Sequence, residues 1–281
     1  MHLARLCLAG LAFAAASAWA EAPLERGKYL VEGILTCGNC HTPRGPGGVL
    51  DTTQRHAGGP QIWETAQYKV RPSNITPDKE TGIGNWSAAQ IKAAIRDGRR
   101  PNGQQISPQM PYGFYKIFAA ADLDAVVAYL QAQPPVARRV EPPVYKVKHM
   151  TLDIPPGAEK PLSEAKLRDP VSRGFYLVTI GHCMECHTPM VEGHRDFKNA
   201  LGTGGERFEG PWGVTVSRNI TPHKQHGIGT WTNDEVKRAI TQGVRKDGTK
   251  LRPPMGYDWY ATMNAADLSA IVSYLRTIPA R

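Results

Sequence analysis

The feature that most constrains the fold is an internal duplication. R-G-K-Y-L begins at Arg26 and R-G-F-Y-L at Arg173, and from Asn74 onward the chain aligns without a gap with the segment that begins at Asn219. Residues 74–131 and 219–276 are identical at 27 of 58 positions, far more than chance produces, so the segments are copies of one unit. A chain of 281 residues has room for two domains of ordinary size. We predict domains over residues 21–137 and 165–281.

Both copies show the pattern of a few short helices joined by Pro- and Gly-rich loops. Ser87 with Gln90, and Thr232 with Glu235, have the spacing of capping boxes, which predict a helix in the middle of each copy. The segments A-D-L-D-A-V-V-A-Y-L and A-D-L-S-A-I-V-S-Y-L place their apolar residues on one helical face and predict a closing helix. The alternation typical of strands is scarce, so we predict a mainly α fold.

The segment between the copies has a different composition. Residues 138–164 contain five prolines, several basic residues and no helical period. We predict an extended connector along the surface and no third domain.

The first 20 residues have the pattern of a secretory signal peptide. A basic residue, Arg5, precedes an apolar run, and small residues at Ala18 and Ala20 form a cleavage site. The apolar run falls short of the roughly 20 residues that span a bilayer. We therefore expect export to the periplasm, removal of residues 1–20 and a mature protein that is soluble or peripherally attached to the membrane.

The charge balance is basic. Formal net charge is +9, and removal of Arg5 with the signal peptide leaves +8. No basic run interleaved with aromatic residues accompanies it, so we exclude nucleic acid as a partner. A positive surface can instead steer an acidic protein partner.

Two copies of the motif C-x-x-C-H carry the chemistry. Cys37, Cys40 and His41 form the first, and Cys183, Cys186 and His187 form the second; this spacing attaches a c-type haem. Two thiols bond to the haem vinyl groups, while the adjacent imidazole reaches the iron. A four-cysteine zinc site would bring its pairs much closer in sequence, and a redox-active disulfide would need a βαβ setting. We therefore predict two covalently attached haems.

Two methionines are the candidates for the second axial ligand. Met110 and Met255 lie at nearly equal distances after His41 and His187, and each follows a loop rich in Pro and Gly. Methionine often only fills gaps in a core, but Met263, another candidate, has no counterpart in the first copy. His/Met coordination raises the haem potential and leaves no open iron position. We predict iron ligation by His41 with Met110 and by His187 with Met255.

At these residues the chain resembles class I cytochromes c. It resembles still more closely the cytochrome c subunits of periplasmic alcohol, aldehyde, gluconate and molybdenum-hydroxylase dehydrogenases. The resemblance is carried by N-I-T-P-D-K-E-T-G-I-G-N-W-S, N-I-T-P-H-K-Q-H-G-I-G-T-W-T, M-P-Y-G-F-Y and M-G-Y-D-W-Y. It implies helices wrapped around each haem. The alcohol and gluconate subunits have three haem domains, whereas this chain has two.

The resemblance also implies roles for residues beside the haems. Pro43 and Pro189 would support the histidine side of each haem, through a backbone carbonyl that accepts the imidazole N–H. Arg71 and Arg218 are possible propionate contacts, since a guanidinium matches carboxylate geometry. A solvated surface role for both arginines stays open.

The resulting hypothesis is an electron carrier with no catalytic residues. Its expected partners are redox proteins: a periplasmic dehydrogenase subunit and a downstream cytochrome or oxidase. The alternative is a dihaem enzyme of peroxidase or thiosulfate-oxidising type with one displaceable axial ligand.

Overall fold

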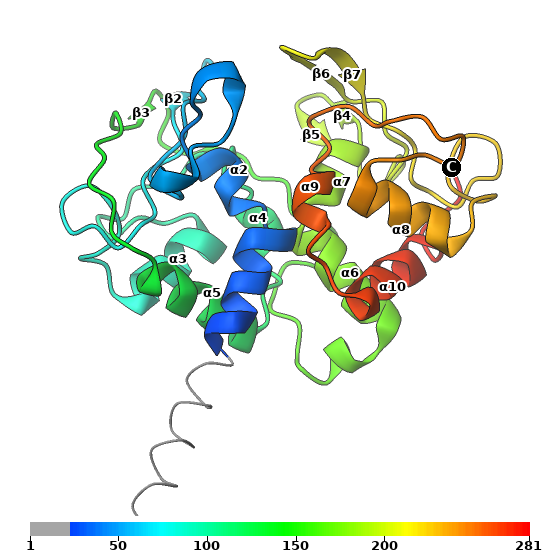
Figure 1. Ribbon diagram of the computed structural model, residues 1–281, viewed down its shortest axis with the longest axis horizontal. Coiled ribbons are helices and arrows are strands. Elements are labelled where there is room, and N and C mark those ends of the chain that lie inside the picture. The colour runs from blue at the N-terminus through cyan, green and yellow to red at the C-terminus, as the bar shows by residue number, and fades with distance from the viewer. Residues whose placement is uncertain (1–22) are drawn as a thin grey trace, which may run out of the picture.

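The computed structural model describes residues 23–281. Figure 1 shows two groups of helices side by side, the blue to green elements of the first repeat and the lime to red elements of the second. We call residues 23–137 the first repeat and residues 165–281 the second repeat. The predicted signal peptide lies outside the described residues.

The first repeat begins with a helical segment, residues 23–29, that continues into a π-helical turn. Its elements are η1 (Leu30–Ile34), α2 (Cys37–His41), η2 (Pro46–Gly48), η3 (Thr52–Gln54), β1 (Trp63–Glu64), β2 (Tyr68–Val70), α3 (Ala88–Asp97), α4 (Tyr112–Tyr115) and α5 (Ala120–Ala132).

After β3 (Val144–Tyr145) in the connector, the second repeat has a similar order, with a hairpin, β4–β5, where the first repeat has η2 and η3. Its elements are η4 (Lys166–Arg168), α6 (Pro170–Ile180), α7 (Cys183–His187), β4 (Met190–Val191), β5 (His194–Arg195), β6 (Arg207–Gly210), β7 (Gly213–Val216), α8 (Asn233–Gln242), α9 (Tyr257–Tyr260) and α10 (Ala265–Leu275).

The predicted helix starts are confirmed. Ser87 and Thr232 each accept a hydrogen bond from the backbone N–H three residues later, and Gln90 and Glu235 bond back to the cap. The predicted apolar faces of α5 and α10 are buried: Leu123, Val126, Val127 and Leu130 in α5, and Leu268, Ile271, Val272 and Leu275 in α10.

A glycine in each R-G-x-Y-L motif lets the first and last helices of the repeat touch. A Cβ atom on Gly27 would lie 2.1 Å from the carbonyl oxygen of Ala125, and one on Gly174 would lie 2.0 Å from that of Ala270. Neither position has room for a side chain, because the obstacle is backbone. The repeated glycine therefore sets the packing distance between the helices.

Short antiparallel hairpins, which the sequence pattern did not predict, lie outside this helical core. β1 pairs with β2, β4 with β5, and β6 with β7, and β3 adds a third strand to β2. Strands of two to four residues are too short for a recognisable alternation of apolar and polar residues. The core remains mainly α, as predicted.

The connector contains no helix, and it is held at several points. β3 pairs with β2, the carboxylate of Asp153 accepts the backbone N–H of Arg195 at 3.0 Å, and Leu162 N–H donates to Ile117 O at 2.9 Å. Met150 and Ala158 are buried. The segment is therefore attached to both repeats.

One apolar core includes residues of both repeats. Phe118 packs edge-on against Tyr176 with ring centroids 6.4 Å apart, and the side chain of Ile34 lies against Gly181. The repeats are thus joined by apolar contacts as well as by the chain.

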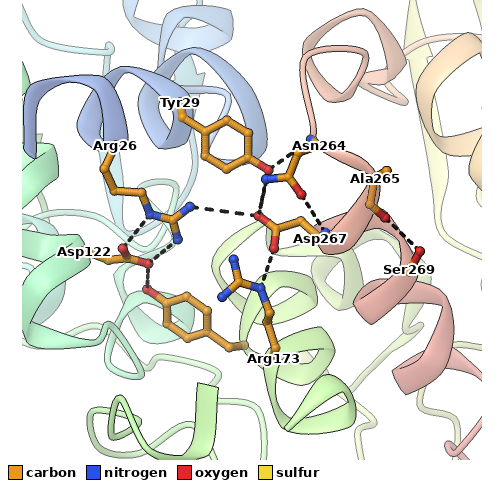
Figure 2. A network of polar contacts seen from close by, with 9 residues as sticks. Arg26, Tyr29, Asp122, Arg173, Asn264, Ala265, Asp267 and Ser269 are labelled. Carbon is orange, nitrogen blue, oxygen red and sulfur yellow. Dashed lines mark hydrogen bonds and ion pairs between the residues drawn. The ribbon is translucent and has the colours of Figure 1, made fainter. Parts of the chain in front are cut away.

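A polar network also joins them, and Figure 2 shows it from close by. Arg26 donates twice to Asp122, at 2.7 and 2.8 Å, within the first repeat. Tyr176 of the second repeat donates its hydroxyl to the same Asp122 carboxylate at 2.8 Å.

The second half of the network repeats this arrangement. Arg173 donates to Asp267 within the second repeat, and Tyr29 of the first repeat donates to Asp267 at 2.7 Å. Each repeat therefore pairs its own arginine and aspartate and receives a tyrosine from the other. This reciprocal exchange fixes how the repeats meet.

Candidate functional site

The two C-x-x-C-H motifs form equivalent one-turn helices, α2 and α7. The residue before each helix, Thr36 or His182, has a left-handed backbone, with φ of 49° or 42°. A helical turn places residues three and four apart on one face. Both thiols and the imidazole of each motif are therefore grouped together, as attachment of one flat cofactor requires.

The four cysteines of the two motifs are free thiols in apolar surroundings. Burial raises the pKa of Cys37, Cys183 and Cys186 to about 12 and that of Cys40 to about 11. Reactive and metal-binding cysteines instead have lowered pKa values in electropositive surroundings. Within residues 23–281 no three His, Cys, Asp or Glu side chains converge as metal ligands. The surroundings of the four thiols are therefore apolar rather than electropositive.

Each motif histidine is oriented by a backbone carbonyl. His41 Nδ1 lies 2.7 Å from Ser73 O, and His187 Nδ1 lies 2.6 Å from Arg218 O. A carbonyl can only accept, so Nδ1–H donates and Nε2 keeps its lone pair. Burial lowers the pKa of both imidazoles, which keeps them neutral. A neutral ring with a fixed tautomer and a free Nε2 is a ready iron ligand.

The implied roles of Pro43 and Pro189 as acceptors of these imidazole protons are wrong. The carbonyl of Pro43 accepts the N–H of Asp51 at 2.8 Å, and that of Pro189 accepts the N–H of Asp196 at 3.0 Å. Those carbonyls stabilise the loop after each motif. The acceptors lie instead at the positions directly before the two N-I-T-P phrases.

The N-I-T-P phrases tie each loop to the end of its repeat. Asn74 Nδ2 donates to Val136 O at 2.8 Å, and Asn219 Nδ2 donates to Arg281 O at 2.6 Å. The residue directly before each asparagine, Ser73 or Arg218, supplies the carbonyl that accepts from the motif histidine. The loop that the asparagine holds in place therefore also orients the imidazole. The repetition of the phrase is visible in the sequence, but this role of the asparagine is not.

The candidate methionine ligands lie beside the same apolar core as the motifs. Met110 and Met255 are partly buried, and each shortly precedes the one-turn helix α4 or α9. The first repeat brings a thiol, an indole and a thioether to this core from three distant segments, and the second does the same. The sets are Cys37, Trp86 and Met110, and Cys183, Trp231 and Met255.

This donor set fits a haem. The thiols would supply the attachment points, and the neutral imidazole and the thioether would supply a nitrogen and a sulfur donor. Ligation by His41, Met110, His187 and Met255 remains a prediction.

The two arginines predicted as propionate contacts differ in their surroundings. Arg71 Nε donates to Glu141 at 2.9 Å and its Nη1 donates to Pro60 O at 3.0 Å, so this guanidinium already has acceptors. Arg218 supplies the carbonyl that holds His187. Their propionate roles remain predictions.

Arg100, which was not among the predicted site residues, lies on the histidine side of the first site. Its positive charge contributes to the lowered pKa of His41, after burial, and its Nε is buried without a hydrogen-bond partner within residues 23–281. The one available signal was its identity with Arg245, 145 positions later.

The two sites face each other across the repeat boundary. A Cβ on Gly38, inside the first motif, would lie 2.7 Å from the ring of Trp259 in α9. Glu185, inside the second motif, adds to the effect of burial in raising the pKa of Cys40. Tyr115 and Tyr260 are buried among the four thiols, and burial raises both of their pKa values well above the usual range. The attachment turns therefore lie near this boundary.

A buried histidine distinguishes the first site from the second. His56 is fully buried and has a left-handed backbone. Its carbonyl accepts the N–H of Ile75, and in the second repeat the carbonyl of Gly202 accepts the N–H of Ile220 in the same way, so a glycine stands where the first repeat has this histidine. Its Nε2 lies 3.7 Å from Glu32 Oε1, but that carboxylate already accepts from Arg55 and Tyr129. Both ring nitrogens lack a hydrogen bond among the described residues.

His56 is expected to make the protein sensitive to acid. Burial, the largest cause, lowers the pKa of His56 to about 3, and the positive charge of Arg55 adds to this effect. The unfolded chain instead takes up this proton near pH 6.5. As pH falls from 6.5 to 3, the unfolded state binds more protons, and the free energy of unfolding decreases by up to about 1.4 kcal/mol per pH unit. Denaturant titrations at several pH values should give a shallower slope for His56→Asn, because asparagine tolerates the left-handed backbone. The exposed His149→Asn change should leave the slope intact, and parallel curves for wild type and His56→Asn would refute the assignment.

Comparison with known proteins shows that the chain is similar to cytochromes c. Residues 171–279 match the cytochrome c family. The chain is 31% identical over 275 residues to a nicotinate dehydrogenase subunit of Pseudomonas putida, a match that covers 92% of this chain and 22% of that protein. It is 30% identical over 276 residues to the fructose dehydrogenase cytochrome subunit of Gluconobacter japonicus, across 92% of this chain and 53% of that subunit. It is 28% identical over 301 residues to a diheme cytochrome c-type protein of Cereibacter sphaeroides, across 99% of this chain and 97% of that protein.

These matches confirm that the chain is related to the c-type cytochromes. More narrowly, it resembles cytochrome c subunits of dehydrogenases and a dihaem cytochrome c, as the motifs predicted. The chain spans about half the length of the fructose dehydrogenase subunit and about a fifth of the nicotinate dehydrogenase subunit. Among residues 23–281, no helix has the length and apolar character needed to cross a bilayer.

Proposed function

We propose that this chain is a periplasmic dihaem electron-transfer protein with two tandem cytochrome c domains, residues 21–137 and 165–281. It takes electrons from a dehydrogenase and passes them to a downstream cytochrome or oxidase. A haem held at each motif would supply an iron that can change between the ferric and ferrous states. The polypeptide attaches the haem, orients one axial imidazole and keeps water from the iron.

One observation carries this proposal: the two repeats hold equivalent attachment turns, α2 and α7, both near the boundary between the repeats. Each has two thiols held in the neutral form, and an imidazole whose Nδ1–H is bound to a carbonyl. Gly38 of the first turn lies against Trp259 in α9 of the second repeat, so the first attachment turn contacts the other repeat directly. We further propose that Arg100, whose Nε has no hydrogen-bond partner within residues 23–281, pairs with a propionate of the first haem.

Transfer is favoured over catalysis by the matched methionines. Both sites have a thioether at an equivalent position, whereas a haem enzyme needs one iron with an open or displaceable ligand. An imidazole on one side and a thioether on the other would fill both iron positions.

The methionine variants test this proposal. Met110→Ala and Met255→Ala should each lower the midpoint potential of one haem, by on the order of 0.1 V or more, because the soft thioether stabilises ferrous iron. Each variant should also let one haem bind carbon monoxide. Redox titration and carbon monoxide difference spectra give both readings.

Met190→Ala is the matched control, since Met190 lies three residues after His187 and is 46% exposed. It should change neither haem. If Met110→Ala or Met255→Ala behaves like this control, that methionine is not a ligand. If the unaltered protein already binds carbon monoxide at one haem, the dihaem enzyme becomes the better description.

A further inference from the structure

Each repeat carries its predicted methionine ligand in a loop, and the two loops correspond residue for residue. The first methionine loop, residues 105–113, contains Met110, and the second methionine loop, residues 250–258, contains Met255 at the position 145 residues later. Both loops run into a one-turn helix, α4 or α9. A difference between the loops therefore acts on one haem site and not on the other.

The connector and the hairpin that it joins cover the first methionine loop. Tyr68, in the strand that pairs with β3, donates its hydroxyl to Gln109 at 3.1 Å, directly before Met110. The side-chain amide of Gln105 donates to Met150 O, and its oxygen accepts the Met150 N–H, both at 3.3 Å. Both ends of the loop's polar surface are therefore held by residues outside it.

A glycine lets the connector backbone lie against this loop. A Cβ on Gly113 would lie 2.3 Å from Asp153 O and 2.9 Å from the side chain of Leu152, so no side chain fits between them. In α4, which includes this glycine, all four residues are buried. The methionine side of the first site is thus covered by a segment of the chain that belongs to neither repeat.

The second methionine loop lacks the residues that make this cover. Gly213 stands at the position of Tyr68, and Pro254 stands at that of Gln109, so neither end of their hydrogen bond has a counterpart. The bond that holds β2 to the first loop therefore cannot form in the second repeat.

The exposure of the two loops follows this difference. Gln109 is the one exposed residue of the first methionine loop, whereas five residues of the second are exposed. The five are Lys250, Arg252, Pro253, Pro254 and Asp258, the last of which replaces Gly113. In α9 Tyr260 alone is buried, whereas every residue of α4 is buried. Water therefore has more access to the methionine side of the second site.

Charge does not separate the two sites in the same way. The exposed charges of the second methionine loop are of both signs, Lys250 and Arg252 against Asp258, and exposed charges act weakly through water and are screened by salt. Each repeat also has one arginine whose Nε is buried without a hydrogen-bond partner within residues 23–281, Arg100 or Arg238. The cover of the methionine side is therefore the difference that we expect to dominate.

Exclusion of water favours the oxidation state of lower charge. The ferric site carries one more positive charge than the ferrous site, and covered, apolar surroundings stabilise a charge less than water does. Access of solvent is therefore one of the factors that set the potential of a haem, and a covered haem has the higher potential.

We propose that the connector covers the methionine side of the first haem and thereby makes its reduction potential the higher of the two. An electron on the second haem then moves to the first: the second iron is oxidised from ferrous to ferric while the first is reduced from ferric to ferrous. This order rests on the proposed function, which assigns one haem to each repeat. At equilibrium a single electron should lie on the first haem about tenfold more often than on the second, or more, which corresponds to about 59 mV for a one-electron couple.

A redox titration of the mature, haem-loaded chain, followed by its optical spectrum, gives the two potentials. Met110→Ala should lower the potential of the first haem and so shows which wave belongs to it, and Met255→Ala does the same for the second. The higher wave should move in Met110→Ala and the lower wave in Met255→Ala. The order should persist in about 1 M salt, because it does not depend on exposed charges.

Gly113→Ala tests the cover itself. Its Cβ would collide with the connector backbone and force the connector away from the loop. The reduction equilibrium of the first haem should become less favourable by about threefold or more, because water then reaches the loop, and that of the second haem should stay unchanged. Gly45→Ala is the matched control, because a Cβ there would meet no atom closer than 4.0 Å, and it should change neither potential.

Gln105→Ala keeps the test available if Gly113→Ala does not fold. It removes both bonds to Met150 and adds no bulk, and it should lower the same potential. Equal potentials, or a higher potential at the second haem, would overturn the proposal. Potentials of Gly113→Ala and Gln105→Ala that match those of the unaltered protein would also overturn it, as would an order that reverses in high salt.

A failure of the proposed function would be recognised separately. If neither methionine variant shifts a wave, the ligand assignment is wrong, whatever the order of the potentials. Cys37→Ala with Cys40→Ala, which should leave the second haem alone, then identifies the waves, and the order of the two potentials is tested on that assignment.

Discussion

The double change Cys183→Ala and Cys186→Ala is expected to halve the covalently bound haem, from two per chain to one. Both thiols lie in apolar surroundings that keep them protonated, and the proposed function assigns them the two thioether bonds of one haem. The first repeat has its own motif, so its haem should still attach. Denaturing mass spectrometry gives the number of haems on each polypeptide, and the pyridine haemochrome absorbance checks it.

The duplication supplies the mirror experiment. Cys37→Ala with Cys40→Ala should also leave one haem, now in the second repeat, and the remaining spectra should differ between the two variants because His56 accompanies only the first site. A variant that still carries two covalent haems would contradict the assignment of its motif. Because mass spectrometry counts haem even on a poorly folded chain, instability alone does not obscure the result.

Asp267→Ala is expected to lower the free energy of unfolding by about 3 kcal/mol. This is the largest loss of stability that we predict for a single buried side chain. Asp267 is fully buried and accepts from Arg173 and from Tyr29 of the other repeat, as Figure 2 shows. Its removal leaves a guanidinium and a hydroxyl without their acceptor, and the cost of an unpaired buried group exceeds the net value of the bond it made. Guanidinium titration of the haem-loaded protein measures the change.

The control is Asp124→Ala, which removes the partner of Lys92. The side chain of Asp124 is 57% exposed, and an ion pair in water contributes about 0 to 1 kcal/mol. If Asp267→Ala were as mild as Asp124→Ala, the reciprocal exchange would not hold the repeats together. Tyr29→Phe and Tyr176→Phe each remove one hydrogen bond between the repeats. A large decrease in the free energy of unfolding for either variant would show that the contacts between repeats supply the stability.

Local signals allowed part of this structure to be predicted. The capping boxes at Ser87 and Thr232 and the apolar faces of α5 and α10 depend on residues within one or two helical turns, so spacing alone identifies them. The grouping of two thiols and an imidazole in each motif is equally local. These parts of the site therefore followed from the residue pattern.

Other features depend on contacts between distant segments, which spacing does not encode. The carbonyls of Ser73 and Arg218 hold the histidines across 32 and 31 positions, and any residue can supply a carbonyl. The R-G-x-Y-L repeat was visible, but its arginine and tyrosine gain meaning only from Asp122 and Asp267 far along the chain. The hairpins were missed because strands of two to four residues leave no periodic pattern.

The most direct test of the central claim is the optical spectrum of the mature, exported protein, oxidised and reduced, with and without carbon monoxide, together with a haem count. We predict two covalent haems per chain, both low-spin in both oxidation states and neither altered by carbon monoxide. One high-spin haem, or one that binds carbon monoxide in the unaltered protein, would contradict the assignment as an electron carrier.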